Sequence, residues 1–238
     1  IIAVFGTLIP AIVNGKIIEM IGSTGGLITL AGIAVTIAGI TLTGRAGILK
    51  DKLLPDDKKT ESIKEFDLKK GLLVALFSGV LSACFAFGIE AGRPISEKVV
   101  AMGVNPLWRQ GPVYIIILLG TFLTNIVWCM ILSFKNKTLK DYFKSPPSIL
   151  IRNYLFSALA GSLWYFQFFL YGMGESKMGK FSFASWSILM ALSIVFSTLW
   201  GLYRKEWKGS DKKVSTILFI GLAVLIISTF IIGLAGLY

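Results

Sequence analysis

Long apolar segments alternate with short polar ones along this chain. Six segments of roughly 20 residues carry little charge, which is the length that a helix needs to cross the hydrocarbon core of a bilayer. They lie at about 26–44, 71–90, 111–133, 150–173, 181–203 and 214–236, and residues 1–13 resemble the tail of a further span. Because the apolar runs are continuous and do not alternate, a transmembrane β-barrel is disfavoured. The pattern predicts an all-α, polytopic membrane helix bundle.

Composition agrees with a membrane protein. Of 238 residues, 55% are hydrophobic and only 16% are charged, and the mean hydropathy is +0.75, which is too apolar for an ordinary soluble domain. The most polar stretch, residues 45–70, is predicted to be a surface linker between two membrane parts, residues 1–44 and residues 71–238. The chain begins at Ile1 inside an apolar segment and without an initiator methionine, so we expect N-terminal helices to be missing from this sequence.

The basic residues indicate the orientation of the spans. The formal net charge is +11, and eighteen Lys and Arg residues fall in the connections at 45–70, 135–152 and 204–213, against six in the other connections. The positive-inside rule places the more basic set in the cytoplasm. No basic run with interleaved aromatic residues lies outside the apolar segments, so nucleic acid is not an expected partner.

The sequence lacks the residues and motifs that metal binding, nucleotide binding and common kinds of catalysis require. The chain contains no histidine, and it lacks a Walker loop, a dinucleotide-binding glycine motif and a paired-cysteine motif. We therefore expect no metal, no cofactor and no enzyme activity. The two cysteines, Cys84 and Cys129, lie in apolar spans and are expected to be small buried side chains.

One stretch, residues 161–175, places an uncharged amide and several aromatic rings inside an apolar segment. Trp164, Gln167 and Tyr171 fall at positions i, i+3 and i+7, on one face of a helix. An unpartnered amide is costly in hydrocarbon, so Gln167 should point into the bundle or a wet cavity. Aromatic rings beside a polar group suit a neutral, hydroxyl-rich ligand. The alternative is a helix-packing seam with one interhelical hydrogen bond.

Polar residues in other spans are further candidates. Glu90 ends a stripe of small and polar residues, and it is the acid with the best claim to lie within a span. It could bind a proton or a substrate hydroxyl in an outer vestibule, or it could pair with Arg93 at a helix end that Pro94 marks. Asn125 lies in a largely apolar segment. The last segment, Thr216 to Gly236, is almost wholly apolar, which predicts either packing within the bundle or a contact in a homo-oligomer.

Ordered motifs along the chain resemble one transporter family. They are Gly25-Gly26 through Thr43-Gly44-Arg45-Ala46-Gly47, residues 65–71 (EFDLKKG), residues 102–107 (MGVNPL), residues 164–171 (WYFQFFLY) and residues 205–207 (KEW). This set is similar to the L-rhamnose–proton symporter family of the drug/metabolite transporter superfamily. The resemblance implies ten helices in two inverted five-helix repeats, and import of L-rhamnose with a proton across the bacterial inner membrane.

The resemblance to a sugar–proton symporter family implies a role for each candidate residue. Trp164 and Tyr171 are expected to stack on or border the sugar, Gln167 and Asn125 to bond its hydroxyls, and Trp186 to close the opposite wall. Glu90 is the candidate for proton coupling. Three alternatives stay open, namely export or exchange of another neutral metabolite, a receptor that does not transport, and a membrane-embedded enzyme, although the spans lack an acid–base pair for the last.

Overall fold

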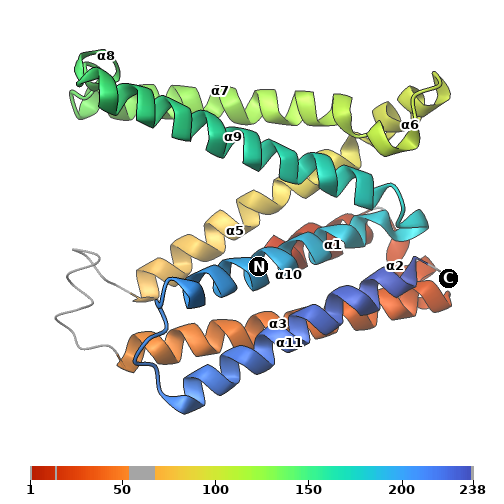
Figure 1. The fold of residues 1–238 in the computed structure, drawn as a ribbon. Coiled ribbons are helices and arrows are strands. Elements are labelled where there is room, and N and C mark those ends of the chain that lie inside the picture. The colour runs from red at the N-terminus through yellow and green to blue at the C-terminus, as the bar shows by residue number, and fades with distance from the viewer. Residues whose placement is uncertain (1, 14, 54–67, 237–238) are drawn as a thin grey trace. The chain divides into compact units, whose positions relative to one another are not determined.

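In a computed structural model of the chain, residues 2–13, 15–53 and 68–236 are described, and this part of the chain is helical without strands (Figure 1). The all-α prediction is confirmed. The α-helices are α1 (Ile2–Val13), α2 (Lys16–Ile21), α3 (Thr24–Leu53), α5 (Leu68–Ala91), α6 (Arg93–Ala101), α7 (Gly111–Lys135), α8 (Asp141–Lys144), α9 (Pro147–Glu175), α10 (Ser185–Tyr203) and α11 (Lys212–Ala235). Two 3₁₀ helices, η1 (Pro106–Trp108) and η2 (Gly179–Ala184), precede α7 and α10.

Within the described residues, five helical segments are long and apolar enough to cross a membrane. They are Thr24–Leu53, Leu73–Ala101, Pro106–Lys135, Phe181–Tyr203 and Lys212–Ala235. The sixth predicted span, at 150–173, forms a helix of 29 residues, α9, but it is not among the five. The central part of α9 includes Gln167, Tyr165 and Tyr171, which lower the hydropathy of this segment.

Local signals explain several helix boundaries. Gly15 has a φ of 67°, a left-handed conformation that glycine adopts at little cost, and it separates α1 from α2. Helix α5 ends at Ala91, and Pro94 occupies the first turn of α6, where its missing N–H is not needed. The helix end predicted at Pro94 is therefore confirmed. Most of the predicted linker, residues 54–67, lies outside the described residues, whereas residues 45–53 continue α3.

The chain divides into two compact units, and each is described by itself. The first comprises residues 1–90 and 177–238. Its longest contact runs between α3 and α11, which lie side by side (Figure 1). Gly32 and Gly39 on α3 face Ile232 and Leu225 on α11, and Gly221 on α11 faces Thr43. Because glycine lets two backbones approach closely, these positions set the packing of the pair.

The second unit comprises residues 91–176 and contains α6, α7, α8 and α9. Gly92 packs against Val113, which joins the start of α6 to α7, and α7 contacts α9. Large apolar side chains along both α7 and α9 are exposed, as expected of surfaces that meet lipid or further helices. Cys84 in the first unit and Cys129 on α7 are exposed free thiols, so the expectation that both are buried is wrong. Apolar character does not distinguish a lipid-facing side chain from a core one.

Candidate functional site

In the first unit, an aromatic pair and a buried hydroxyl pair lie where α10 begins. The Trp186 side chain is 4% exposed and stacks on Phe85 of α5, with ring centroids 5.9 Å apart. Gly6 of α1 leaves the room that the Trp186 indole occupies. The hydroxyls of Thr7 and Ser187 are 2.8 Å apart and buried. Three helices, α1, α5 and α10, therefore meet at Trp186.

Glu90 lies in the same unit, half-buried at the end of α5. Its carboxylate accepts a hydrogen bond from Lys16 Nζ at 2.8 Å, and the Lys16 ammonium also lies 5.3 Å from the centre of the Phe183 ring. The ring of Phe183 and the indole of Trp186 are three positions apart in sequence, so Lys16 links Glu90 to the segment that carries Trp186. Arg93, which the sequence offered as the partner of Glu90, forms an ion pair with Glu97 at 3.7 Å. A pair between Glu90 and Arg93 stays a prediction.

A cavity of about 610 Å³ also lies in the first unit. Its lining comes from α1, α3, α5 and α10 and is uncharged: Ala3, Ile40, Ala75, Ser78, Gly79, Met190, Ser193, Ile194 and Ser197. The cavity lining and Trp186 share one face of α10. Met190 lies one turn after Trp186, and Ser193 and Ser197 lie on the following turns of that face. Serine hydroxyls between apolar walls suit a neutral ligand that carries hydroxyl groups.

In the second unit, the buried face of α9 differs from the face of Trp164, Gln167 and Tyr171 that the sequence singled out. Trp164 is 47% exposed, Gln167 is exposed and Tyr171 is only half-buried. The buried positions are instead Phe168, Gly172 and Glu175, at i, i+4 and i+7. Gln167 and Tyr171 each lie one position before a buried residue, Phe168 or Gly172, which is a rotation of about 100° around the helix axis.

Asn125 on α7 is exposed, and its side-chain amide donates to the carbonyl of Thr121 one turn earlier at 2.9 Å. Trp164, Gln167, Tyr171 and Asn125 thus belong to the second unit, while Glu90 and Trp186 belong to the first. Within the second unit, the ring of Trp164 meets that of Phe168 edge-on, with centroids 4.9 Å apart. A sugar site that includes Trp164, Gln167, Tyr171, Asn125 and Trp186 stays a prediction, and so does proton coupling by Glu90.

The buried face of α9 ends in a polar cluster that the sequence did not reveal. Arg109 Nη2 donates to both carboxylate oxygens of Glu175 at 2.8 Å, and Gln110 Nε2 donates to Oε2 of Glu175 at 3.1 Å. The Glu175 residue is 6% exposed. The available signal in the sequence is one base, Arg109, and one acid, Glu175, at the ends of apolar segments.

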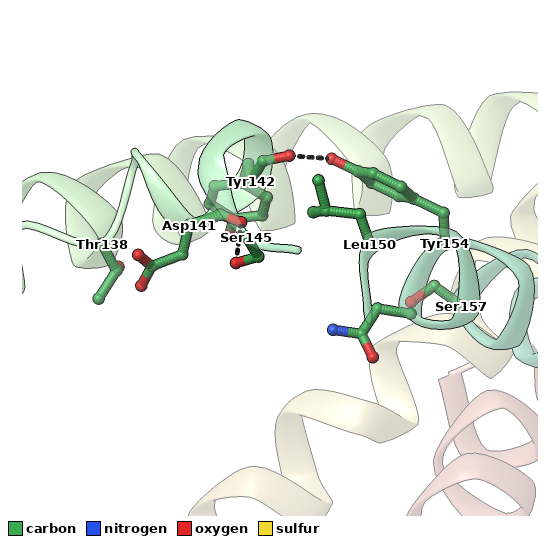
Figure 2. Close-up of a pocket in the computed structure, with 8 residues that line it drawn as sticks. Thr138, Asp141, Tyr142, Ser145, Leu150, Tyr154 and Ser157 are labelled. Atoms are coloured by element: carbon green, nitrogen blue, oxygen red, sulfur yellow. Dashed lines mark hydrogen bonds between the residues drawn. The ribbon is translucent and has the colours of Figure 1, made fainter. Parts of the chain in front are cut away.

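A second cavity of about 330 Å³ lies where α7 connects to α9 (Figure 2). It is lined by Thr138, Asp141, Tyr142, Ser145, Leu150, Asn153, Tyr154 and Ser157. The Tyr154 hydroxyl donates to the Tyr142 carbonyl at 2.7 Å, and the Ser145 hydroxyl donates to the Asp141 carbonyl at 3.0 Å. Figure 2 marks both bonds with dashed lines. These two hydroxyls therefore hold the connection between α7 and α9 together. Within residues 2–13, 15–53 and 68–236, no group of three or more His, Cys, Asp or Glu side chains could hold a metal ion.

Comparison with known proteins identifies relatives along the whole chain. The family model for the L-rhamnose-proton symport protein matches residues 1–237. L-rhamnose-proton symporters from Yersinia pestis (strain Pestoides F) and Yersinia pseudotuberculosis (serotype O:1b, strain IP 31758) are each 37% identical over 234 residues, which are 97% of this chain and 67% of theirs. The symporter from Citrobacter koseri is 36% identical over the same length. No solved structure matches. On this evidence the chain belongs to the L-rhamnose-proton symport protein family.

Proposed function

We propose that this protein imports L-rhamnose, or a closely related neutral sugar, together with a proton. The observation that carries the proposal is the family match over residues 1–237. Membership of a symport family, together with five apolar helices, makes the chain a multi-pass protein of the bacterial inner membrane and a transporter, not an enzyme. The uncharged, serine-lined cavity of the first unit supports a neutral substrate.

The architecture that we propose has ten helices in two five-helix repeats of opposite orientation. Residues 1–44 would form the end of the first repeat, residues 45–70 a cytoplasmic connection and residues 71–238 the second repeat. The support is the charge distribution, because eighteen of the Lys and Arg residues fall in the connections at 45–70, 135–152 and 204–213. Inverted repeats are common in secondary transporters, where substrate sites lie near the middle of the membrane.

For the sugar, we propose binding residues in each unit, namely Trp186 and the serine-lined cavity in the first unit, and Trp164, Gln167, Tyr171 and Asn125 in the second. Trp164 and Tyr171 would border the sugar ring, and Gln167 and Asn125 would bond its hydroxyls. The exposure of Gln167, Asn125 and the Trp164 ring leaves them accessible to a ligand. Aromatic faces and amide groups together recognise the apolar C–H face and the hydroxyl groups of a sugar.

Replacing Gln167 by alanine tests the contribution of α9. If its amide bonds a sugar hydroxyl, the KM for L-rhamnose rises about fivefold to tenfold, since one hydrogen bond is worth about 1 kcal/mol. Uptake kinetics in proteoliposomes measure the change. Asn153→Ala, an exposed amide near the other end of α9, is the matched control and should leave the KM unchanged. An unchanged KM in Gln167→Ala would remove this residue from the site.

For proton coupling, we propose Glu90. Its carboxylate is half-buried at the end of an apolar helix and is paired with Lys16, so binding a proton would remove the charge that holds the pair together. Such a change can link the protonation state of the carboxylate to the positions of α2 and α5. Ionisable groups within membrane segments commonly mark ion pathways.

Uptake of labelled L-rhamnose by the full-length protein in proteoliposomes tests the function as a whole. We expect accumulation above the outside concentration only when an inward proton gradient is imposed. Glu90→Gln should abolish this accumulation while sugar exchange between the two sides continues, because the neutral amide cannot carry a proton. Glu97→Gln, an exposed acid seven residues later, is the matched control and should accumulate sugar normally.

Other results would change the proposal. If accumulation of L-rhamnose is the same with and without the proton gradient, proton coupling is contradicted. If Glu90→Gln accumulates the sugar, Glu90 is excluded as the coupling group. Folded protein that takes up no L-rhamnose would move the function to another neutral metabolite, whose identity counterflow with a panel of labelled solutes would reveal.

The surface of helix α11 could contact the rest of the chain, lipid or a second copy of the protein. Its contact with α3 confirms the packing role that its apolar sequence predicted. The exposed side chains of Phe219, Ile226 and Phe230 lie on its remaining surface, which we propose faces lipid. A homo-oligomer contact there stays a prediction.

A further inference from the structure

Three buried polar atoms at the start of α7 have no hydrogen-bond partner among the described residues. They are Nε of Arg109, the amide oxygen Oε1 of Gln110 and the hydroxyl oxygen of Tyr114. Gln110 is 5% exposed and Tyr114 is 2% exposed, so bulk solvent cannot satisfy these groups. Buried polar atoms in proteins are nearly always paired, and a cluster of three unpaired ones points to a ligand.

Glu175 explains why these atoms are left over. Its carboxylate engages Nη2 of Arg109 and the amide nitrogen of Gln110, which fixes both side chains and leaves Nε and Oε1 for another partner. Gly172, one turn earlier on α9, keeps space open beside them. A Cβ atom there would lie 3.0 Å from the Tyr114 hydroxyl and 3.2 Å from Cβ of Gln110.

The kinds of atoms identify the ligand chemistry. Arg109 Nε offers a donor, Gln110 Oε1 offers an acceptor, and the Tyr114 hydroxyl can do both. An anion would require donors only and a cation acceptors only, whereas a hydroxyl group uses both. An aromatic wall adjoins the cluster, because Trp108 is 43% exposed and packs on Phe169 with ring centroids 4.8 Å apart. An exposed aromatic ring is a surface on which the C–H face of a sugar can stack.

We infer that Arg109, Gln110 and Tyr114, held in place by Glu175, bind one hydroxyl group of the transported sugar beside Trp108. The inference rests on the proposed function and adds a binding site to it. The charge distribution places the connection at 91–110 outside the cell, so the site would receive a sugar from the outer side. A water molecule offers the same hydroxyl chemistry, and the experiment separates the two sources.

Tyr114→Phe removes the hydroxyl and keeps the ring. In the full-length protein in proteoliposomes, we expect the KM for L-rhamnose to rise about fivefold to tenfold with little change in the maximal rate. Gly172→Ala should act in the same direction, because its methyl group crowds the Tyr114 hydroxyl. Tyr165→Phe is the matched control, since Tyr165 is a 42% exposed tyrosine on α9, and its KM should equal that of the unchanged protein.

Singly deoxygenated L-rhamnose analogues identify the bound hydroxyl. The analogue that lacks it should bind the unchanged protein more weakly than L-rhamnose and should show no further loss in Tyr114→Phe, since the two changes remove one contact. If the KM of Tyr114→Phe matches the unchanged protein for L-rhamnose and every analogue, water satisfies these atoms and the inference is overturned. If Tyr114→Phe does not fold, isothermal titration of Gly172→Ala with the same sugars decides by the same criterion. If the unchanged protein neither binds nor transports L-rhamnose, the proposed function fails first, and this inference fails with it.

Discussion

Replacing Gly39 by valine is expected to prevent α3 and α11 from packing and to destabilise the first unit by about 3 kcal/mol or more. A Cβ atom at Gly39 would lie 2.8 Å from Cγ and Cδ2 of Leu225 and 3.1 Å from its backbone nitrogen. The leucine side chain can rotate away, but the backbone of α11 cannot move without losing the rest of the contact. Valine adds two further methyl groups to this clash. The measurement is the melting temperature and the yield of monodisperse protein in detergent.

Two further variants serve as a control and as a second test of the same contact. Gly44→Val, on the same helix, is the control, because a Cβ there meets no atom within 4 Å and the two variants share the cost of a β-branched residue. Gly221→Val approaches the same contact from α11, where a Cβ would lie 3.0 Å from the backbone nitrogen of Thr43, and it should be as damaging as Gly39→Val. Equal melting temperatures for Gly39→Val and Gly44→Val would contradict the close packing of α3 on α11.

Glu175→Ala should destabilise the second unit by about 3 kcal/mol, because it leaves Arg109 in a largely buried position without its counter-ion. The carboxylate accepts hydrogen bonds from both Arg109 and Gln110, so the change also leaves the Gln110 amide nitrogen unpaired. The side chain of Arg109 is 23% exposed, which keeps the expected loss at the lower end of the range for buried ion pairs. Thermal unfolding of the full-length protein in detergent measures it.

Glu97→Ala is the matched control for this ion pair. Glu97 pairs with Arg93 at 3.7 Å with a side chain that is 69% exposed, and an exposed pair of this kind contributes at most about 1 kcal/mol. A double variant, Arg109→Met with Glu175→Leu, should recover much of the lost stability, since apolar side chains can replace a buried ion pair. If Glu175→Ala melts at the temperature of Glu97→Ala, the carboxylate is not buried against Arg109.

Much of the fold follows from local sequence. The lengths of the apolar runs predicted the long helices, and within the described residues five helical segments are long and apolar enough to cross a membrane. Proline and glycine marked boundaries correctly, as at Gly15 between α1 and α2 and at Pro94 in the first turn of α6. The ordered motifs also predicted the family. All of these signals lie within a few residues of one another, and so they need no knowledge of which helices are neighbours.

The faces of the helices were harder to predict. Polar and aromatic spacing favoured Trp164, Gln167 and Tyr171 as the inner face of α9, while the structure buries Phe168, Gly172 and Glu175. In a soluble protein the apolar side of a helix marks the core. In a membrane the lipid is as apolar as the protein interior, so helix faces toward either can have the same composition. The exposed thiols of Cys84 and Cys129 illustrate the same ambiguity.

By itself, the sequence determined that this chain is a helical membrane protein of a sugar–proton symport family, where its helices lie along the chain, and which residue types are absent. Only the tertiary structure decided which polar groups meet. Lys16 pairs with Glu90 across 74 positions of sequence and Arg109 with Glu175 across 66. The serine cavity likewise takes its lining from four helices. Hydropathy and helical period report on single helices, whereas these contacts depend on how different helices pack, which no local pattern encodes.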